Sequence, residues 1–306
     1  MLRILVVLEN RDEGAWLVKK AVKLAHAYGA SLHFYKHSYS SSVDDFDRFF
    51  GFDNLEDMKQ QMLQDDTNWV QEFVAAQNLE GVDSTCAATW NRRLYQGVLA
   101  EVENSHCDLI LKAANVHNRL YEIVHTPDDW SLMREANCPV MLIRGPSQKS
   151  SEAQVPADRQ PVIAAVNPLE DGAAHRELHA RVLKQASELA KGLQTGLIVV
   201  AAVPMFNYNT PYFVGVAGQY PNLQESMRSS AKERLDAMLQ EHAVETDRVI
   251  IEDGSAEFII ERICDESRAQ FLVIGTVANK GLAGVFLGNT AERILHHVNR
   301  DLLVVQ

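Results

Sequence analysis

Apolar residues follow two patterns along the chain, and both patterns occur in each half. Short, almost unbroken apolar runs at residues 4–10 and 162–168 predict strands buried on both faces. Stretches with apolar residues every three or four positions predict amphipathic helices between such strands. Further strands are predicted at residues 32–39, 108–112 and 139–144 in the first half, and at 197–203, 270–275 and 302–306 in the second.

The helical stretches also correspond between the halves. They are predicted around residues 16–25, 55–74 and 98–102 in the first half, and around 178–189, 223–239, 259–263 and 291–298 in the second. Gly29 and Gly192 follow the first helix of each half, where a left-handed residue would end the helix. The similarity between the halves has a period of about 160 residues, which indicates a duplicated fold.

Strands that alternate with helices predict right-handed crossovers and parallel sheets covered on both faces. We therefore expect an α/β protein made of two tandem doubly wound parallel-sheet domains, at residues 1–145 and 160–306. Residues 146–159 are rich in Ser, Pro and Gln and are predicted to be a linker. The two domains are expected to pair within the chain about a pseudo-two-fold axis, and a homodimer is also possible.

Composition narrows the classes of partner. The net charge of −12 argues against direct binding to nucleic acid or to an anionic membrane surface. No apolar stretch is long enough for membrane insertion, and the apolar run at the N-terminus is too short for a signal peptide. The four cysteines are far apart and form no CxxC motif, as is typical of a reducing compartment. These features predict a soluble, cytoplasmic protein.

The candidate chemistry lies in residues 275–292, directly after a predicted strand of the second half. Glycine lets backbone NH groups approach a phosphate, and the N-terminus of a helix attracts anions. The residues of this loop expected to contact a ligand are Gly275, Lys280, Gly281, Gly288, Asn289 and Thr290. Together they predict a small-molecule site that accepts a phosphate group.

This loop resembles the phosphate loop of the universal stress protein family, in which G-x-x-G is followed by nine residues and then G-[S/T]. The resemblance extends over the whole chain, including a turn at residues 252–257 and the segment 117–130. It implies Rossmann-like domains, an adenine nucleotide such as ATP as the ligand, and a cytoplasmic role in survival of stress, including DNA damage.

Three residues depart from the family pattern. Ala278 replaces the second glycine, Asn289 replaces Ser or Thr, and Asn167 stands where nucleotide-binding members carry an Asp that contacts the adenosine. Asn167 can still form a hydrogen bond with a ligand hydroxyl. Two interpretations therefore remain open for the second half: nucleotide binding, or a glycine-rich turn that only joins a strand to a helix.

The first half contains no comparable loop. Residues 112–130 lack glycine and contain bulky side chains, so a packed cap and an empty cleft are predicted there. No metal site is expected, because the histidines at 117, 125, 296 and 297 and the acidic residues at 44, 45 and 47 lack the spacing of ligands. They are interpreted as solvated or packed side chains.

Residues 204–221 form a long aromatic segment without charge, which predicts a domain or subunit contact or a site for an amphiphile. An alternative function is therefore a scaffold that acts through protein contacts. No nucleophile elbow or Walker motif is present, so no catalytic residue is assigned, and at most slow ATP hydrolysis is expected.

Overall fold

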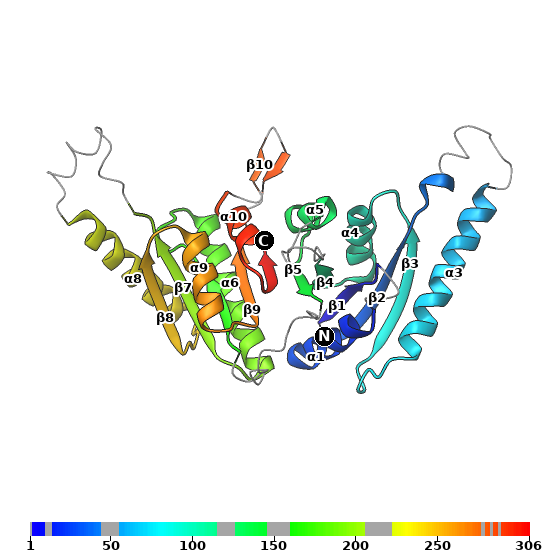
Figure 1. Ribbon diagram of the computed structural model, residues 1–306, viewed down its shortest axis with the longest axis horizontal. Helices are drawn as coiled ribbons and strands as arrows, with labels where there is room; N and C mark the ends of the chain where they lie inside the picture. The colour runs from blue at the N-terminus through cyan, green and yellow to red at the C-terminus, as the bar shows by residue number, and fades with distance from the viewer. Residues whose placement is uncertain are drawn as a thin grey trace. The chain divides into compact units, whose positions relative to one another are not determined.

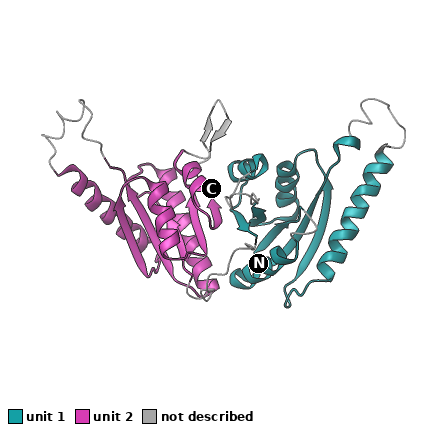
Figure 2. Ribbon diagram, in the orientation of Figure 1, with its two compact units in different colours: residues 1–149 teal, residues 150–306 magenta. Residues whose placement is uncertain are grey.

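The computed structural model divides the chain into two compact units, unit 1 (residues 1–149) and unit 2 (residues 150–306) (Figure 2). Both are α/β, with helices placed between successive strands of the chain (Figure 1). The structure describes residues 2–9, 14–43, 55–114, 126–145, 160–205, 222–276, 279–281, 284–286 and 289–306.

The strands of unit 1 lie in the order β3-β2-β1-β4-β5, and each neighbouring pair is parallel. The first strand therefore lies in the centre of the sheet. Strands β2 and β3 follow on one side of it and β4 and β5 on the other, as in doubly wound folds. The elements in chain order are β1 (Arg3–Val7), α1 (Gly14–Tyr28), β2 (Ser31–Ser38), α3 (Leu55–Ala75), β3 (Ser84–Trp90), α4 (Leu94–Ser105), β4 (Leu109–Ala114), α5 (Pro127–Glu135) and β5 (Val140–Arg144).

Unit 2 repeats this topology, with the order β8-β7-β6-β9-β12 and parallel pairing throughout. The predicted fold class, two tandem doubly wound domains with parallel sheets, is confirmed. Its elements are β6 (Val162–Ala165), α6 (Ala173–Leu193), β7 (Leu197–Val203), α8 (Leu223–Glu241), β8 (Arg248–Asp253), α9 (Ala256–Glu266), β9 (Phe271–Gly275), β10 (Asn279–Gly281), β11 (Gly284–Phe286), α10 (Asn289–His297) and β12 (Asp301–Val305).

The central strands form the core of each unit. All six residues of β4 are buried, as are all five of β12, which explains why these strands are apolar apart from Lys112 and Asp301. The edge strand β3 has no buried residue, and only one residue of β8 is buried. The difference in burial follows the position of each strand in its sheet.

The ends of the first helices differ from one another. Gly29 follows α1 with φ +61°, as the sequence predicted for a left-handed end. The prediction for Gly192 was wrong: α6 continues through it and ends at Leu193, and Gln194 takes the left-handed conformation with φ 55°. The NH of Gln194 donates a hydrogen bond to the carbonyl of Ala190. The helix therefore ends with a left-handed cap, although the capping residue is not glycine.

Other elements also differ from the sequence prediction: β3 and β8 were not predicted, and residues 127–130, predicted as part of a packed cap, begin α5. The turn predicted at residues 252–257 is shorter, because Glu252 and Asp253 belong to β8 and α9 starts at Ala256. Within the glycine-rich loop, β10 and β11 pair antiparallel as a small hairpin, which no pattern in the sequence indicated. The loop therefore carries secondary structure of its own.

All four cysteines are free thiols, and three of them are buried. Burial raises the pKa of the Cys107 thiol to about 11 and those of Cys138 and Cys264 to about 12. Burial also raises the pKa of the half-buried Cys86. The thiols therefore stay protonated near neutral pH and pack as small apolar groups.

Candidate functional site

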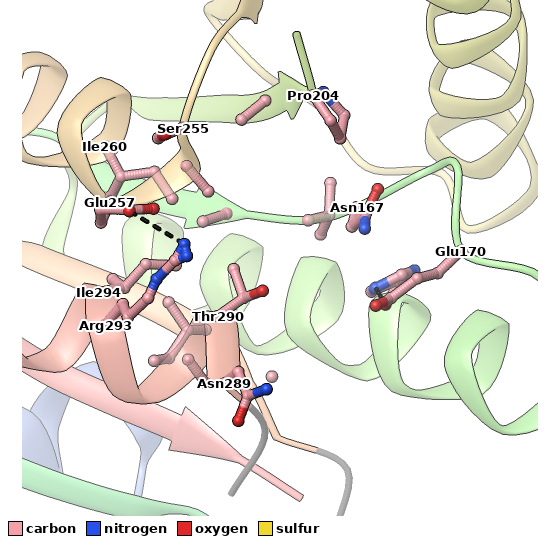
Figure 3. Close-up of a pocket in the computed structure, with 18 of the residues that line it drawn as sticks. Asn167, Glu170, Pro204, Ser255, Glu257, Ile260, Asn289, Thr290, Arg293 and Ile294 are labelled. Carbon is pink, nitrogen blue, oxygen red and sulfur yellow. Dashed lines mark ion pairs between the residues drawn. The ribbon is translucent and has the colours of Figure 1, made fainter. Parts of the chain in front are cut away.

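A cavity of about 580 Å³ lies at the carboxyl ends of the strands of unit 2. Its walls come from the ends of β6, β7, β8 and β9, from the start of α6, and from the first turns of α9 and α10. Ligands of open α/β sheets bind at this edge, outside the carboxyl ends of the strands. The cavity is therefore the candidate binding site of unit 2 (Figure 3).

Asn167 follows β6 and lines the cavity. Its Oδ1 accepts a hydrogen bond from the NH of Leu169 at 3.2 Å, and its carbonyl oxygen accepts one from the NH of Glu170 at 3.2 Å. The side-chain oxygen thus holds the turn after β6. The amide NH₂ group, a donor, remains the part of Asn167 best suited to contact a ligand.

The same turn brings Glu170 to two histidines of α6. Oε2 of Glu170 lies 3.2 Å from Nδ1 of His175 and 3.7 Å from Nε2 of His179, and all three residues line the cavity. The histidines are four residues apart and so share one face of the helix. Burial lowers the pKa of His179; Glu170 acts to raise it, and His175 acts to lower it further. His179 is therefore mostly neutral at pH 7.

The first turn of α10 contributes to another wall of the cavity, on the far side from Glu170 (Figure 3). Asn289 and Thr290 begin the helix, so its unpaired backbone NH groups lie at this wall. Arg293, on the next turn, pairs with the buried carboxylate of Glu257 at 3.2 Å. This wall supplies donors and a cation, which suit an anionic group of a ligand.

The structure brings four of the seven predicted site residues together: Asn167, Gly275, Asn289 and Thr290 line this cavity. Lys280 and Gly281 belong to β10, in the hairpin of the same loop. Gly288 lies outside the described residues.

The structure also gives Gly275 a packing role. A Cβ on Gly275 would lie 2.8 Å from Cγ of Leu178 and 3.0 Å from Cγ2 of Val182. The missing side chain therefore lets α6 pack closely on β9, whatever it does for a ligand.

Unit 1 places an ion-pair cluster where unit 2 has its cavity. Lys112 is fully buried, and its Nζ contacts Oδ1 of Asp129 at 2.9 Å and Oε1 of Glu9. Lys112 is the last residue of β4 that pairs with β1, as Ile274 is the last of β9 that pairs with β6.

The two partners of Lys112 also have counterparts in unit 2. Glu9 lies two residues after β1, as Asn167 lies two residues after β6, and Asp129 and Ala291 are each the third residue of a nine-residue helix. The counterparts of the cluster, Asn167, Ile274 and Ala291, all line the cavity of unit 2.

The charges of this cluster stabilise one another. Burial by itself would lower the pKa of the Lys112 ammonium, but Asp129 and Glu9 more than offset this and hold the pKa above its ordinary value. Oδ2 of Asp129 also accepts a hydrogen bond from the NH of Thr126 at 2.7 Å, in the capping box at the start of α5. Charged side chains of unit 1 therefore occupy the place that corresponds to the cavity.

Of the other candidates from the sequence, only those within the described residues can be assessed. Among the described residues no group of three His, Cys, Asp or Glu side chains could hold a metal ion. His296 and His297 are exposed on α10, as expected. His117, His125, the acidic residues at 44, 45 and 47, and residues 206–221 lie outside the described residues.

No helix in the described part of the chain is long and apolar enough to cross a membrane.

Five cavity residues were missed by the sequence reasoning: Glu170, His175, His179, Glu257 and Arg293. The spacing of the two histidines on one helix face, close after Glu170, was the available signal. Nothing in the sequence connected Glu257 with Arg293, because the pair joins α9 to α10 through the fold.

Comparisons with known proteins agree with the topology. The model of the universal stress protein family matches residues 1–144 and 173–306. Universal stress protein E of Photorhabdus laumondii is 26% identical over 99% of this chain and 94% of its own length. Universal stress protein E of Escherichia coli K12 is 27% identical over 99% and 93%.

Solved structures support the same conclusion. The crystal structure of a functionally unknown protein from Pseudomonas aeruginosa PAO1 is 27% identical and superposes with a TM-score of 0.71, covering 99% of this chain and 92% of that one. The family match, the doubly wound topology and the duplication extend over nearly the whole sequence. The chain therefore belongs to the universal stress protein family, with two such domains in tandem.

Proposed function

We propose that this chain is a cytoplasmic stress-response protein that binds one adenine nucleotide, in the cavity of unit 2, and supports survival of stress, including DNA damage. The observation that carries the proposal is the cavity itself. Its volume of about 580 Å³ falls within the range of about 300–1,000 Å³ typical of small-molecule sites. The nucleotide is the ligand that membership of the family suggests.

The polar groups of the cavity suit the two parts of a nucleotide. The start of α10 and Arg293 offer donors and positive charge to phosphates. Ile260, Ile274 and Ile294 supply apolar surface for a base. In unit 1 the buried side chains of Lys112 and Asp129, together with the partly exposed Glu9, occupy the corresponding place, which supports one nucleotide per chain.

Nucleotide binding is tested by titrating ATP into the purified chain in a calorimeter. Asn289→Asp places a carboxylate at the first residue of α10, where an acidic residue favours the helix but repels phosphate. We expect the affinity for ATP to fall at least tenfold. Asn222→Asp is the matched control, because it makes the same change at the N-terminus of α8 at a residue that does not line the cavity.

The proposal fails if the unchanged chain does not bind ATP, or if both variants bind it as the unchanged chain does. Native mass spectrometry of freshly purified protein complements the titration. A retained molecule with the mass of a lipid or another amphiphile would favour the alternative that residues 204–221 suggest.

A further inference from the structure

Three titratable side chains share one wall of the cavity in unit 2. Glu170 lies between His175 and His179, with its Oε2 at 3.2 Å and 3.7 Å from one nitrogen of each ring. The ring centroids of the two histidines are 6.5 Å apart. A proton on either imidazole therefore has the carboxylate as its neighbour.

The charge of the described cavity lining depends on these protons. Glu170 and Glu257 carry two negative charges and Arg293 one positive charge, so the net charge is −1 when both histidines are neutral. Protonation of both histidines changes it to +1. Asp171 in the same turn pairs with Arg234 of α8 at 2.8 Å, and Asp253, next to the lining residue Gly254, pairs with Arg228 of α8, so the charges of each pair cancel. The sign of the lining thus depends on the cluster.

We infer that the Glu170–His175–His179 cluster couples the binding of a phosphate-bearing ligand in this cavity to the uptake of protons by the protein. The inference rests on the proposed function, because it takes the ligand to be anionic. An anion favours the protonated form of nearby histidines, and by linkage protonated histidines favour the anion. The ligand is therefore held more tightly in mildly acidic solution than at pH 8.

The direction of the effect agrees with the state of the ligand-free site. Burial lowers the pKa of His179, so this ring is mostly neutral at pH 7 and can accept a proton when an anion binds. The terminal phosphate of a nucleotide takes up a proton near pH 6, which lowers its charge and weakens binding. If ATP binds more tightly at lower pH, the proton that strengthens binding must therefore be taken up by the protein.

The test is calorimetric titration of the full chain with ATP between pH 8 and pH 6, in buffers with low and high ionisation enthalpy. We expect about threefold tighter binding for each pH unit, which corresponds to net uptake of about half a proton for each ATP bound. The His175→Gln/His179→Gln variant should lose both effects. His26→Gln/His242→Gln removes two exposed histidines, which do not line the cavity, and should keep both effects.

Glu170→Gln should strengthen the binding of ATP, which damage to the site would not do. The change removes one negative charge from the lining while keeping the size of the side chain, so ATP should bind several-fold more tightly than to the unchanged chain at pH 8. Binding without proton uptake, or uptake that persists in His175→Gln/His179→Gln, would overturn this inference and leave the proposed function intact. No binding at any pH would overturn both.

Discussion

Lys112 illustrates how a single side chain distinguishes the two units. Its ammonium is fully buried between Glu9 and Asp129. Lys112→Ile gives unit 1 the residue that unit 2 has at the same place, but leaves two carboxylates without their cation. Loss of one partner from a buried pair costs about 3–5 kcal/mol, so the free energy of unfolding should fall by this amount in urea titrations.

A second variant separates charge from packing at this position. Glu9→Asn/Lys112→Ile/Asp129→Ala introduces all three residues of unit 2 and leaves no charge uncompensated in the cluster. Replacement of a whole buried charged group costs much less than removal of one member, so most of the stability should return. Equal losses in the single and triple variants would show that the ion pairs are not the cause.

The residues of the candidate site were only partly predictable for a related reason. Glycines followed by the start of a helix indicate a loop that can bind phosphate, so local sequence was enough to select Gly275, Asn289 and Thr290 as candidate site residues. All three line the cavity. Lys112 and Asp129 could not, because the cluster depends on strand register and on a capping box that join distant segments. In the sequence, Lys112 looks like the polar end of a strand.

At the scale of the element, α5 depends on its first residues. Thr126 Oγ1 accepts a hydrogen bond from the NH of Asp129 at 3.2 Å, and Pro127 occupies the first helical position. Thr126→Ala should lower the free energy of unfolding by about 1 kcal/mol, because an orphan NH loses its acceptor. Thr67→Ala, within α3, should have a much smaller effect, since its hydroxyl only bonds back to the carbonyl of Leu63. Equal effects of the two variants in urea titrations would contradict the role of the cap.

Elements were predictable where burial imposes a pattern. The central strands are buried on both faces, so their apolar runs stand out in the sequence. The third strand of unit 1, Ser84–Trp90, was not located, because an edge strand without a buried residue has no such run. The end of α6 was missed because Gln194 can adopt a conformation usually left to glycine.

At the scale of the whole molecule, each unit contains a histidine whose pKa is lower in the folded protein than its ordinary value. Burial lowers the pKa of His37 in unit 1 and of His179 in unit 2 below 6.5, despite hydrogen bonding to Asn91 and the charge of Glu170 respectively. As the pH falls below 6.5, the unfolded chain takes up protons that the folded chain does not. The free energy of unfolding should therefore decrease between pH 7.5 and 5.5.

Urea titrations at the two pH values measure this decrease. His37→Gln/His179→Gln should reduce it, because neither position then titrates. A free energy of unfolding that rises on acidification, or a double variant with the same decrease, would contradict the assignment.

The arrangement of two units predicts where the chain is cut first. The linker predicted at residues 146–159 spans the division between unit 1 and unit 2 and contains two trypsin sites, Lys149 and Arg159. Brief trypsin treatment should cleave there and yield two fragments of similar size, seen by mass spectrometry. Early cleavage inside α3 or α8 would contradict this boundary. The pairing of the two domains about a pseudo-two-fold axis stays a prediction.

The raised pKa values of the four thiols determine how fast the cysteines react with an oxidant. Only the thiolate reacts rapidly with peroxide or an alkylating reagent, and burial keeps all four cysteines in the thiol form. Iodoacetamide should therefore label the three buried cysteines of the folded chain, Cys107, Cys138 and Cys264, slowly and at a rate limited by opening of the fold. The labelling rate of these three buried thiols therefore measures how often the fold opens, and an oxidant reaches them only in such openings.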